Sequence, residues 1–247
     1  MSEWVQARLS SRHDWAEGLM TIRLNEFKPR FIAGQFFNLG LELGERRIRR
    51  AYSAASAPGE AAEFVISKVV GGELTPLLFE LQVGGSLWVQ QSPAGFFTLD
   101  FVPSGVRDLW LIATGTGIGP YVSMLRDGLL SAYERVIVVH GVRFVSHLTY
   151  SGEFIAFTQA HTGSAYVPVV TGKADTDHSF LSERIPTLLE SGALERAAGA
   201  TLTPDNSHVL LCGNPDMIRE GIAVLERRGL KRNRRREPGH ITMEKYW

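Results

Sequence analysis

Hydrophobic and polar residues alternate in short runs through the first hundred positions, a pattern typical of β-strands. Turn residues separate the runs, for example at 57–59, 71–72 and 84–85. The pattern predicts six strands, at residues 4–9, 19–24, 36–41, 48–54, 63–69 and 86–90. One short helix is predicted at 75–81, with Thr75 as its cap and Pro76 in its first position. Closely spaced strands of this kind are typical of an antiparallel barrel.

After Pro103 the pattern changes, because compact apolar strands now alternate with helices. Strands are predicted at 109–113, 136–139, 166–170 and 208–212. The first is followed by a helix with apolar positions at a spacing near 3.6, namely Ile118, Tyr121, Val122, Leu125 and Leu129. The last precedes a helix with Ile218, Ile222 and Leu225 on one face. We therefore predict a six-stranded antiparallel β-barrel domain at 1–100 and a doubly wound parallel α/β domain at 101–247.

The composition limits the class of protein but indicates no additional candidate site. The 247 residues are 44% hydrophobic and 21% charged, which is typical of a soluble globular chain. Lysine plus arginine equals aspartate plus glutamate, 26 each, so net charge indicates neither a nucleic-acid nor a membrane partner. The single cysteine, Cys212, excludes an internal disulfide and a cysteine-ligated metal cluster within one chain. Residues 1–10 have no apolar core of signal-peptide length, and no apolar run approaches the roughly 20 residues of a membrane span, so we expect a soluble cytoplasmic protein. We also expect a monomer.

A glycine-rich turn at residues 115–120 lies between the first apolar strand of the second domain and its amphipathic helix. Glycines let the backbone approach a pyrophosphate, and the N–H groups and dipole of a helix start favour its negative charge. Pro120 suits the first helical turn, where its missing N–H needs no partner. The spacing differs from the usual G-x-G-x-x-G. The turn predicts a nucleotide site, although such a string is also typical of a purely structural turn.

The charge after the second strand of this domain bears on the choice of nucleotide. That strand ends at His140 to Arg143, and no acidic residue occurs between Arg135 and Gly152. An NAD site usually has an acidic residue here for the ribose hydroxyls, whereas the 2'-phosphate of NADP calls for arginine. Arg143 therefore favours NADP, unless it is a solvated surface cation. A second cation nearby would distinguish these alternatives.

The strand predicted at 48–54 carries a second candidate site. Arg50 and Tyr52 lie on one face of it, and Ala51 and Ser53 on the other. A tyrosine among small residues offers a flat surface for a stacked ring, and an arginine two residues away can reach a phosphate. The arrangement suits a flavin dinucleotide, although four such residues are also found in ordinary surface strands.

These features occur in one order along the chain: residues 50–53, the turn at 115–120, His140 with Arg143, residues 212–215, and an aromatic C-terminus. In that order they resemble the ferredoxin-NADP reductase family, in particular its bacterial flavodoxin/ferredoxin-NADP reductases. The resemblance covers essentially the whole chain. It implies FAD-dependent electron transfer between NADPH and a one-electron carrier, ferredoxin or flavodoxin, by hydride transfer between nicotinamide C4 and flavin N5.

The resemblance also implies roles for individual residues. Tyr52 stacks on the flavin ring, Arg50 binds the FAD pyrophosphate, and Ser53 hydrogen-bonds near flavin N5. The implied FAD-binding set is Arg50, Ala51, Tyr52, Ser53, Gly72, Leu74 and Thr75. The implied NADP-binding set is Gly115, Thr116, Gly117, Gly119, Arg143, Arg184 and, as a substitute for a family arginine that this chain lacks, Lys173. Cys212, Gly213 and Asn214 are expected beside the reacting rings, with Tyr52, Ser53 and Cys212 as the catalytic set.

Two further segments carry open alternatives. Cys212 is expected to pack near the flavin, because no His/Asp constellation accompanies it in sequence as a reactive thiol would require. Tyr246 and Trp247 are expected against FAD, either over the flavin ring, where they would limit nicotinamide access, or over the adenine. The rival enzymatic function is that of an NAD(P)H flavin reductase of the same superfamily, which uses flavin as a substrate.

Seven cations fall within ten residues, a segment that we call the basic segment: Arg227, Arg228, Lys231, Arg232, Arg234, Arg235 and Arg236. Such a run is typical either of a solvated helix end or of a dock for an acidic redox protein, since complementary charge steers encounter. A non-catalytic module that anchors a redox partner is a third alternative. Nucleic acid is not an expected partner, because groove-reading or stacking elements do not accompany the cations.

Overall fold

The computed structural model describes residues 3–172 and 180–246. The chain divides into two compact units by its internal contacts. We call Met1–Thr98 with Gly119–Asp127 the β unit, and Leu99–Ile118 with Gly128–Trp247 the α/β unit. The division differs from a single cut near residue 100 in one respect, since the segment Gly119–Asp127 belongs to the β unit.

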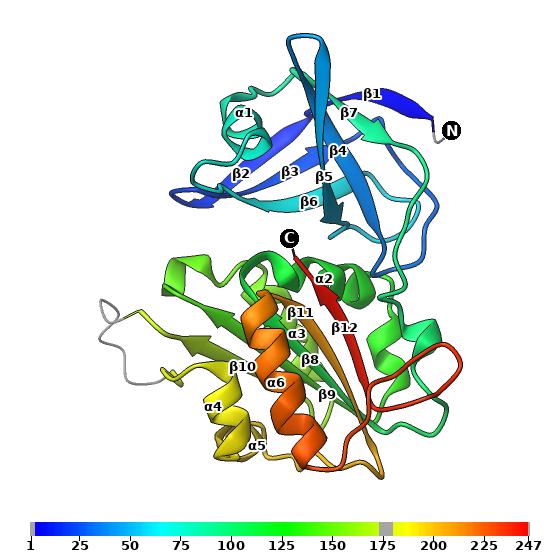
Figure 1. Cartoon of the computed structure of the whole chain (residues 1–247), viewed down its shortest axis with the longest axis vertical. Helices are drawn as coiled ribbons and strands as arrows, with labels where there is room; N and C mark the ends of the chain where they lie inside the picture. Colours follow the sequence, from blue (N-terminus) through cyan, green and yellow to red (C-terminus); the bar gives the residue numbers. More distant parts are fainter. Residues whose placement is uncertain (1–2, 173–179, 247) are drawn as a thin grey trace. The chain divides into compact units, whose positions relative to one another are not determined.

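The β unit contains antiparallel strands in two sheets, ordered β1-β7-β4-β5 and β2-β3-β6 (Figure 1). The strands are β1 (Trp4–Arg8), β2 (Ser11–Ala16), β3 (Leu19–Leu24), β4 (Phe36–Leu43), β5 (Arg46–Ser53), β6 (Ala62–Ser67) and β7 (Ser86–Gln90). Their apolar faces share one core, with Phe37, Leu39 and Phe64 fully buried within it. This is the antiparallel architecture that the alternating pattern predicts.

The strand β2 has no counterpart among the predicted strands. Its residues are mostly polar, and it lies at the edge of its sheet beside β3. An edge strand buries little apolar surface, so it carries no clear hydrophobic alternation. The turn after it contains Gly18 in a left-handed conformation, with φ of 72°.

The prediction that Thr75 caps the short helix is wrong. Helix α1 spans Leu74–Glu80, and the position before it is Glu73, whose side chain makes no capping bond. Thr75 lies inside the first turn, where its Oγ1 accepts a hydrogen bond from the Val69 N–H at 2.9 Å. The Thr75 hydroxyl therefore stabilises the loop before the helix and does not cap the helix.

The α/β unit contains a five-stranded parallel sheet in the order β10-β9-β8-β11-β12 (Figure 1). Its strands are β8 (Asp108–Thr114), β9 (Arg135–Val142), β10 (Ala165–Val170), β11 (Ser207–Gly213) and β12 (Ile241–Lys245). The helices are α3 (Ser151–Ala160), α4 (Ile185–Glu190), α5 (Ala193–Ala198) and α6 (Pro215–Arg227), with short 3₁₀ turns η1 (Leu99–Phe101), η2 (Gly115–Ile118), η3 (Leu129–Ala132) and η4 (Val145–His147). The parallel sheet confirms the predicted class, while β12 is an addition that sequence reasoning missed.

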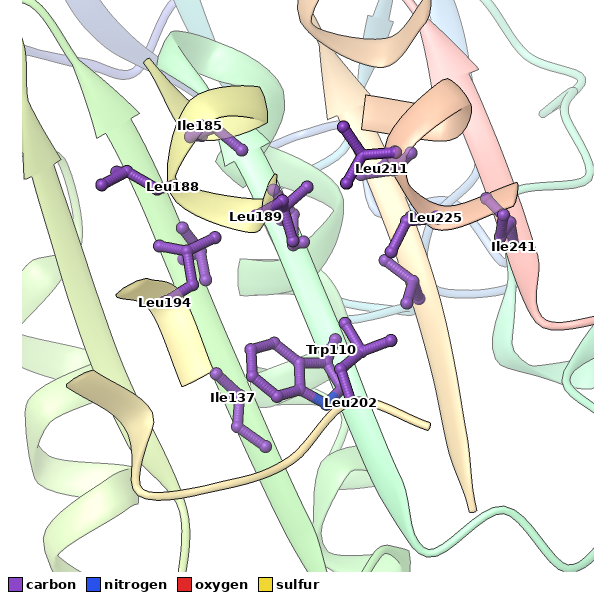
Figure 2. Close-up of a cluster of buried hydrophobic side chains, with 14 of the residues drawn as sticks. Trp110, Ile137, Ile185, Leu188, Leu189, Leu194, Leu202, Leu211, Leu225 and Ile241 are labelled. Atoms are coloured by element: carbon purple, nitrogen blue, oxygen red, sulfur yellow. The ribbon is translucent and has the colours of Figure 1, made fainter. Parts of the chain in front are cut away.

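Helices cover both faces of this sheet. On one face α4, α5 and α6 pack on β8, β9 and β11 around the buried Trp110, with Ile137 and Leu202 beside it in Figure 2. On the other face α3 packs on β10, where the rings of Phe154 and Tyr166 stack with centroids 5.9 Å apart. The unit is therefore doubly wound, as the alternation of strands and helices predicts.

Helix α2 (Gly119–Arg126) begins within the glycine-rich turn and belongs to the β unit. Its Ser123 hydroxyl donates to the Ser56 carbonyl at 2.7 Å. Its Arg126 guanidinium donates to the Ala55 carbonyl at 3.0 Å and to a Glu63 carboxylate oxygen at 2.9 Å. These bonds explain why α2 belongs to the β unit, although in sequence it follows β8 of the α/β unit.

Candidate functional site

The strand order of the α/β unit changes direction between β8 and β11. From β8 the chain runs outward to β9 and β10, then returns to the other side of β8 to form β11 and β12. Ligands of open α/β sheets bind outside the carboxyl ends of the strands at such a switch point. The glycine-rich turn follows β8, and residues 212–215 form the end of β11 and the start of the next helix, so both predicted segments meet there.

Close backbone packing fixes the glycine-rich turn. A Cβ on Gly117 would lie 2.6 Å from the Cys212 carbonyl oxygen, and one on Gly213, whose φ is 121°, would lie 2.3 Å from the Thr114 hydroxyl. By contrast, a Cβ on Gly115 would meet nothing within 4 Å, although its φ is 53°. Gly117 and Gly213 thus let the two strand ends touch, while open space lies above Gly115, as a bound phosphate would need.

The start of α6 completes this edge of the sheet. The Asn214 side chain caps the helix by accepting hydrogen bonds from the N–H groups of Asp216 and Met217, at 2.8 and 3.1 Å. The Asn214 N–H in turn donates to Thr114 Oγ1 at 2.8 Å. Pro215 occupies the first helical position. Thr114, which sequence reasoning did not single out, therefore ties β8 to the start of α6.

A buried histidine on β9 forms a hydrogen bond with the glycine-rich turn. His140 on β9 is fully buried, with Nε2 3.1 Å from the Gly115 carbonyl oxygen and Nδ1 3.3 Å from the Tyr166 hydroxyl. Burial lowers the pKa of His140 to about 4, although the Gly115 carbonyl acts in the opposite direction. The ring is therefore neutral, with Nε2–H donating to Gly115. In the sequence, this role of His140 is indicated by its position as an ionisable residue inside the apolar run 136–142.

Cys212 and Tyr246 meet on the same side of the sheet. The Cys212 thiol is fully buried, and burial together with the nearby Glu244 charge raises its pKa well above the usual value, against the effect of a bond with Tyr246. The Tyr246 N–H donates to the Gly213 carbonyl at 3.0 Å, and its hydroxyl donates to the Thr116 carbonyl at 3.3 Å. Cys212 is consequently a neutral packing group, and Tyr246 tethers the C-terminal segment to the glycine-rich turn.

The predicted cations of this unit lie beyond the end of β9. Arg143 is exposed, and its guanidinium lies over the Phe144 ring at 5.3 Å from the centroid. Arg184 directly precedes α4 and pairs with Glu220 at 3.4 Å. A Cβ on Gly141 would lie 2.7 Å from Ile185, so the segment after Arg184 packs on the end of the strand that Arg143 follows. Lys173 lies outside the described residues.

In the β unit, strand β5 carries the other predicted site. It lies at the edge of its sheet, pairs with β4, and places Tyr52 opposite Phe37. Burial raises the pKa of Tyr52 to about 12, with a smaller opposing effect from the charge of Arg50, so the phenol is neutral. Arg50 is exposed and donates to the Arg49 carbonyl at 2.8 Å. Within the described ranges Arg50 has no carboxylate partner, so its charge is available to a phosphate.

Ala51 is exposed beside these residues, and Ser53 ends the strand in a buried position. The loop before α1 lies near β5, because Arg46 on that strand forms an ion pair and hydrogen bond with Glu73. In this loop the Gly72 N–H donates to the Val69 carbonyl at 3.0 Å. Leu74 is buried, with an exposed fraction of 1%.

The basic segment is less open than its sequence indicates. Four of its arginines pair with acidic side chains of the same unit: Arg227 with Glu190, Arg228 with Glu195, Arg232 with Glu226, and Arg234 with Glu237. Arg235 and Arg236 are exposed and, among residues 3–172 and 180–246, have no such partner. Across the same ranges the helices fall short of the length and apolar character that a transmembrane segment requires.

Comparison with known proteins agrees with this arrangement. Residues 7–98 match the model of the oxidoreductase FAD-binding domain, and residues 111–221 match that of the oxidoreductase NAD-binding domain. The chain is 37% identical over 250 residues to the flavodoxin/ferredoxin–NADP reductase of Escherichia coli strain K12, and 35% identical over 259 residues to that of Buchnera aphidicola subsp. Schizaphis graminum, with 100% of both chains covered in each case. A crystal structure of a ferredoxin NADP+ reductase from Neisseria gonorrhoeae with bound FAD and NADP superposes with a TM-score of 0.91, at 29% identity and 99% coverage of both chains.

The two units thus define a flavin- and nicotinamide-dependent oxidoreductase. More closely, the chain belongs to the flavodoxin/ferredoxin–NADP reductase family. The family resemblance inferred from the order of the motifs is therefore confirmed. Trp247 lies outside the described residues.

Proposed function

We propose that this protein transfers electrons between NADPH and ferredoxin or flavodoxin, with FAD as its bound cofactor. The observation that carries the proposal is the meeting of the glycine-rich turn, Gly213 and Tyr246 at the switch point of the parallel sheet. The family of the chain supplies the class of partner. The first unit is the FAD domain and the second the NADP domain, with helix α2 bonded to the first.

FAD supplies the redox chemistry, because a flavin accepts a hydride from nicotinamide and releases its two electrons singly. In the β unit Arg50 binds the FAD pyrophosphate, since its guanidinium is exposed and has no carboxylate partner among the described residues. Tyr52 offers a neutral ring on which the flavin stacks, and Ser53 offers a hydroxyl group near flavin N5. The loop at Gly72 and the first turn of α1, with Leu74 and Thr75, complete the predicted FAD contacts.

In the α/β unit the glycine-rich turn binds the NADP pyrophosphate with backbone N–H groups, because the space beside Gly115 is open. Arg143 and Arg184 bind the 2'-phosphate. To do so, Arg184 gives up its ion pair with Glu220. Lys173 stays a predicted third cation. Gly213 and Asn214 shape the nicotinamide pocket, and Cys212 packs beneath it as a neutral group.

An absorption spectrum followed by anaerobic titration tests this function. The purified protein is expected to show bound-flavin absorbance, which one equivalent of NADPH bleaches and one equivalent of NADH bleaches far less. Loss of the flavin on gel filtration, with turnover restored by free flavin, would instead identify a flavin reductase. Protein that stays colourless after FAD is added would contradict both functions.

We further propose that the acidic carrier docks on the basic segment through Arg235 and Arg236, the two arginines there without an acidic partner in the described part of the chain. Replacing both by alanine is expected to slow carrier reduction at low salt and to flatten its dependence on ionic strength. Arg227→Ala is the matched control, because Arg227 is already paired with Glu190. An unchanged salt profile in the double variant would remove the segment from the docking surface.

A further inference from the structure

A glycine at the end of β10 lies against the backbone of Arg143. The sheet pairing of β9 and β10 ends at Val142 and Val170, but two hydrogen bonds extend it. The Thr171 N–H donates to the Val142 carbonyl at 3.0 Å, and the Gly172 N–H donates to the Arg143 carbonyl at 2.7 Å. Gly172 therefore forms the last described rung between these two strands, at the residue that carries the candidate phosphate-binding cation.

Only a residue without a side chain fits this rung. A Cβ on Gly172 would lie 2.2 Å from the Arg143 carbonyl oxygen, far inside contact distance. It would also lie 3.0 and 3.1 Å from Cδ1 and Cε1 of Phe144. Since the nearest atom belongs to the backbone, it cannot turn away as a flexible side chain would, so the two strand ends would have to separate.

The Phe144 ring connects this close approach to the guanidinium. The ring packs edge-on against His147, with centroids 5.4 Å apart, and its face lies 5.3 Å from the Arg143 guanidinium carbon. Cation–π contact of this kind restrains an otherwise mobile side chain. Displacing either the Arg143 carbonyl or the Phe144 ring would redirect the cation.

We propose that Gly172 is a positioning residue for nucleotide specificity: its missing side chain lets β10 hold Arg143 and Phe144 where the guanidinium meets the 2'-phosphate of NADP. The inference rests on the proposed function, because it takes Arg143 as the phosphate ligand. Gly172 itself contacts no phosphate. It acts through the position of its neighbours.

Calorimetric titration of the FAD-loaded protein with adenosine 2',5'-bisphosphate and with 5'-AMP tests the proposal, because only the first ligand carries the 2'-phosphate. Gly172→Ala is expected to weaken the bisphosphate about three- to tenfold and to leave 5'-AMP unchanged, part of the loss expected for removing a charged hydrogen bond. The ratio of kcat/KM for NADPH over NADH should fall by the same factor, through KM.

Gly152→Ala is the matched control, since it adds the same methyl group in the same unit, at the start of α3, where a Cβ meets nothing within 4 Å. Phe144→Ala is a second variant, expected to reproduce the selective loss without placing a methyl group on the rung. An unchanged bisphosphate affinity in Gly172→Ala, or equal weakening of both ligands by that variant, would overturn the role of Gly172.

Arg143→Ala separates this inference from the proposed function. It is expected to weaken the bisphosphate about ten- to a hundredfold, the range for losing a charged hydrogen bond, and Gly172→Ala should add nothing in that background. If Arg143→Ala has no effect, the assignment of the 2'-phosphate to Arg143 fails and the inference fails with it. If Arg143→Ala has the expected effect and Gly172→Ala has none, only the inference fails.

Discussion

The two units form their candidate sites by different means. In the β unit the site consists of side chains on an edge strand, where Arg50 is exposed and has no acidic partner in the described chain. In the α/β unit it consists of backbone groups, held by glycines that leave no room for a Cβ at Gly117 or Gly213. The first site is therefore formed by exposed side chains, and the second by backbone groups at positions where a side chain would clash.

This difference predicts how each site fails. Removing a side chain from β5 takes away a ligand contact but little packing, so cofactor affinity should fall while the fold remains. Adding one methyl group at the switch point forces two strands apart, so the fold itself should suffer. The following predictions, ordered from the largest expected effect to the smallest, test that contrast.

Gly213→Ala should cost about 3 kcal/mol or more of unfolding free energy, because it combines an unfavourable φ of 121° with a clash 2.3 Å from the Thr114 hydroxyl. Urea denaturation measures the loss. Gly105→Ala is the control, since Gly105 also has a positive φ, of 86°, but meets nothing within 4 Å, and it should cost about 1 kcal/mol. Equal losses would mean that close packing at the switch point contributes nothing.

Acid should destabilise the α/β unit through buried histidines that the structure describes there, His140 and His208. Burial lowers the pKa of His140 and of His208 to about 4, and the charge of His240 contributes at His208. Below about pH 6.5 the unfolded chain binds protons that the folded chain refuses, so stability falls from there to about pH 4, by at most about 3 kcal/mol for each histidine.

Urea titrations at several pH values between 4 and 7 measure this slope. His140→Gln should flatten it, because glutamine keeps a donor for the Gly115 carbonyl but does not titrate. His13→Gln on the exposed strand β2 is the control. A slope unchanged by His140→Gln would show that the support beneath the glycine-rich turn does not set the acid sensitivity.

Arg50→Ala should weaken FAD binding about ten- to a hundredfold, the range for losing one charged hydrogen bond, and leave the melting temperature of the apoprotein unchanged. Arg49→Ala is the matched control, because Arg49 is an equally exposed neighbour that points to the opposite face of β5. Fluorescence titration of apoprotein with FAD distinguishes them. Equal losses in both variants would mean that general positive charge, and not one directed contact, binds the phosphate.

Trp110→Phe should change stability by less than about 1 kcal/mol, although the ring is fully buried in the α/β core, beside Ile137 and Leu202 in Figure 2. The substitution leaves a small cavity, but it also removes an indole N–H that has no hydrogen-bond partner in the described structure. The two effects oppose each other. A loss of about 3 kcal/mol in urea denaturation would show that the core tolerates side-chain changes no better than the switch point does.

The sequence by itself determined the two architectures and the two cofactor motifs. Strand alternation, the change of rhythm after Pro103, and the residues 50–53 and 115–120 are local patterns that local geometry imposes. A glycine that permits a close turn, or an arginine beside a tyrosine on one strand face, can be recognised without knowing what lies opposite. The polar edge strand β2 gave no such pattern and was missed.

Only the tertiary structure decided which distant residues meet. It placed Thr75 against Val69, His140 beneath Gly115, and Gly172 against Arg143. It also showed that much of the basic segment is paired, with Arg228 against Glu195 for example, and that α2 is bonded to the β unit. These outcomes depend on contacts between segments far apart in the chain, whose geometry exists only once the sheets have formed.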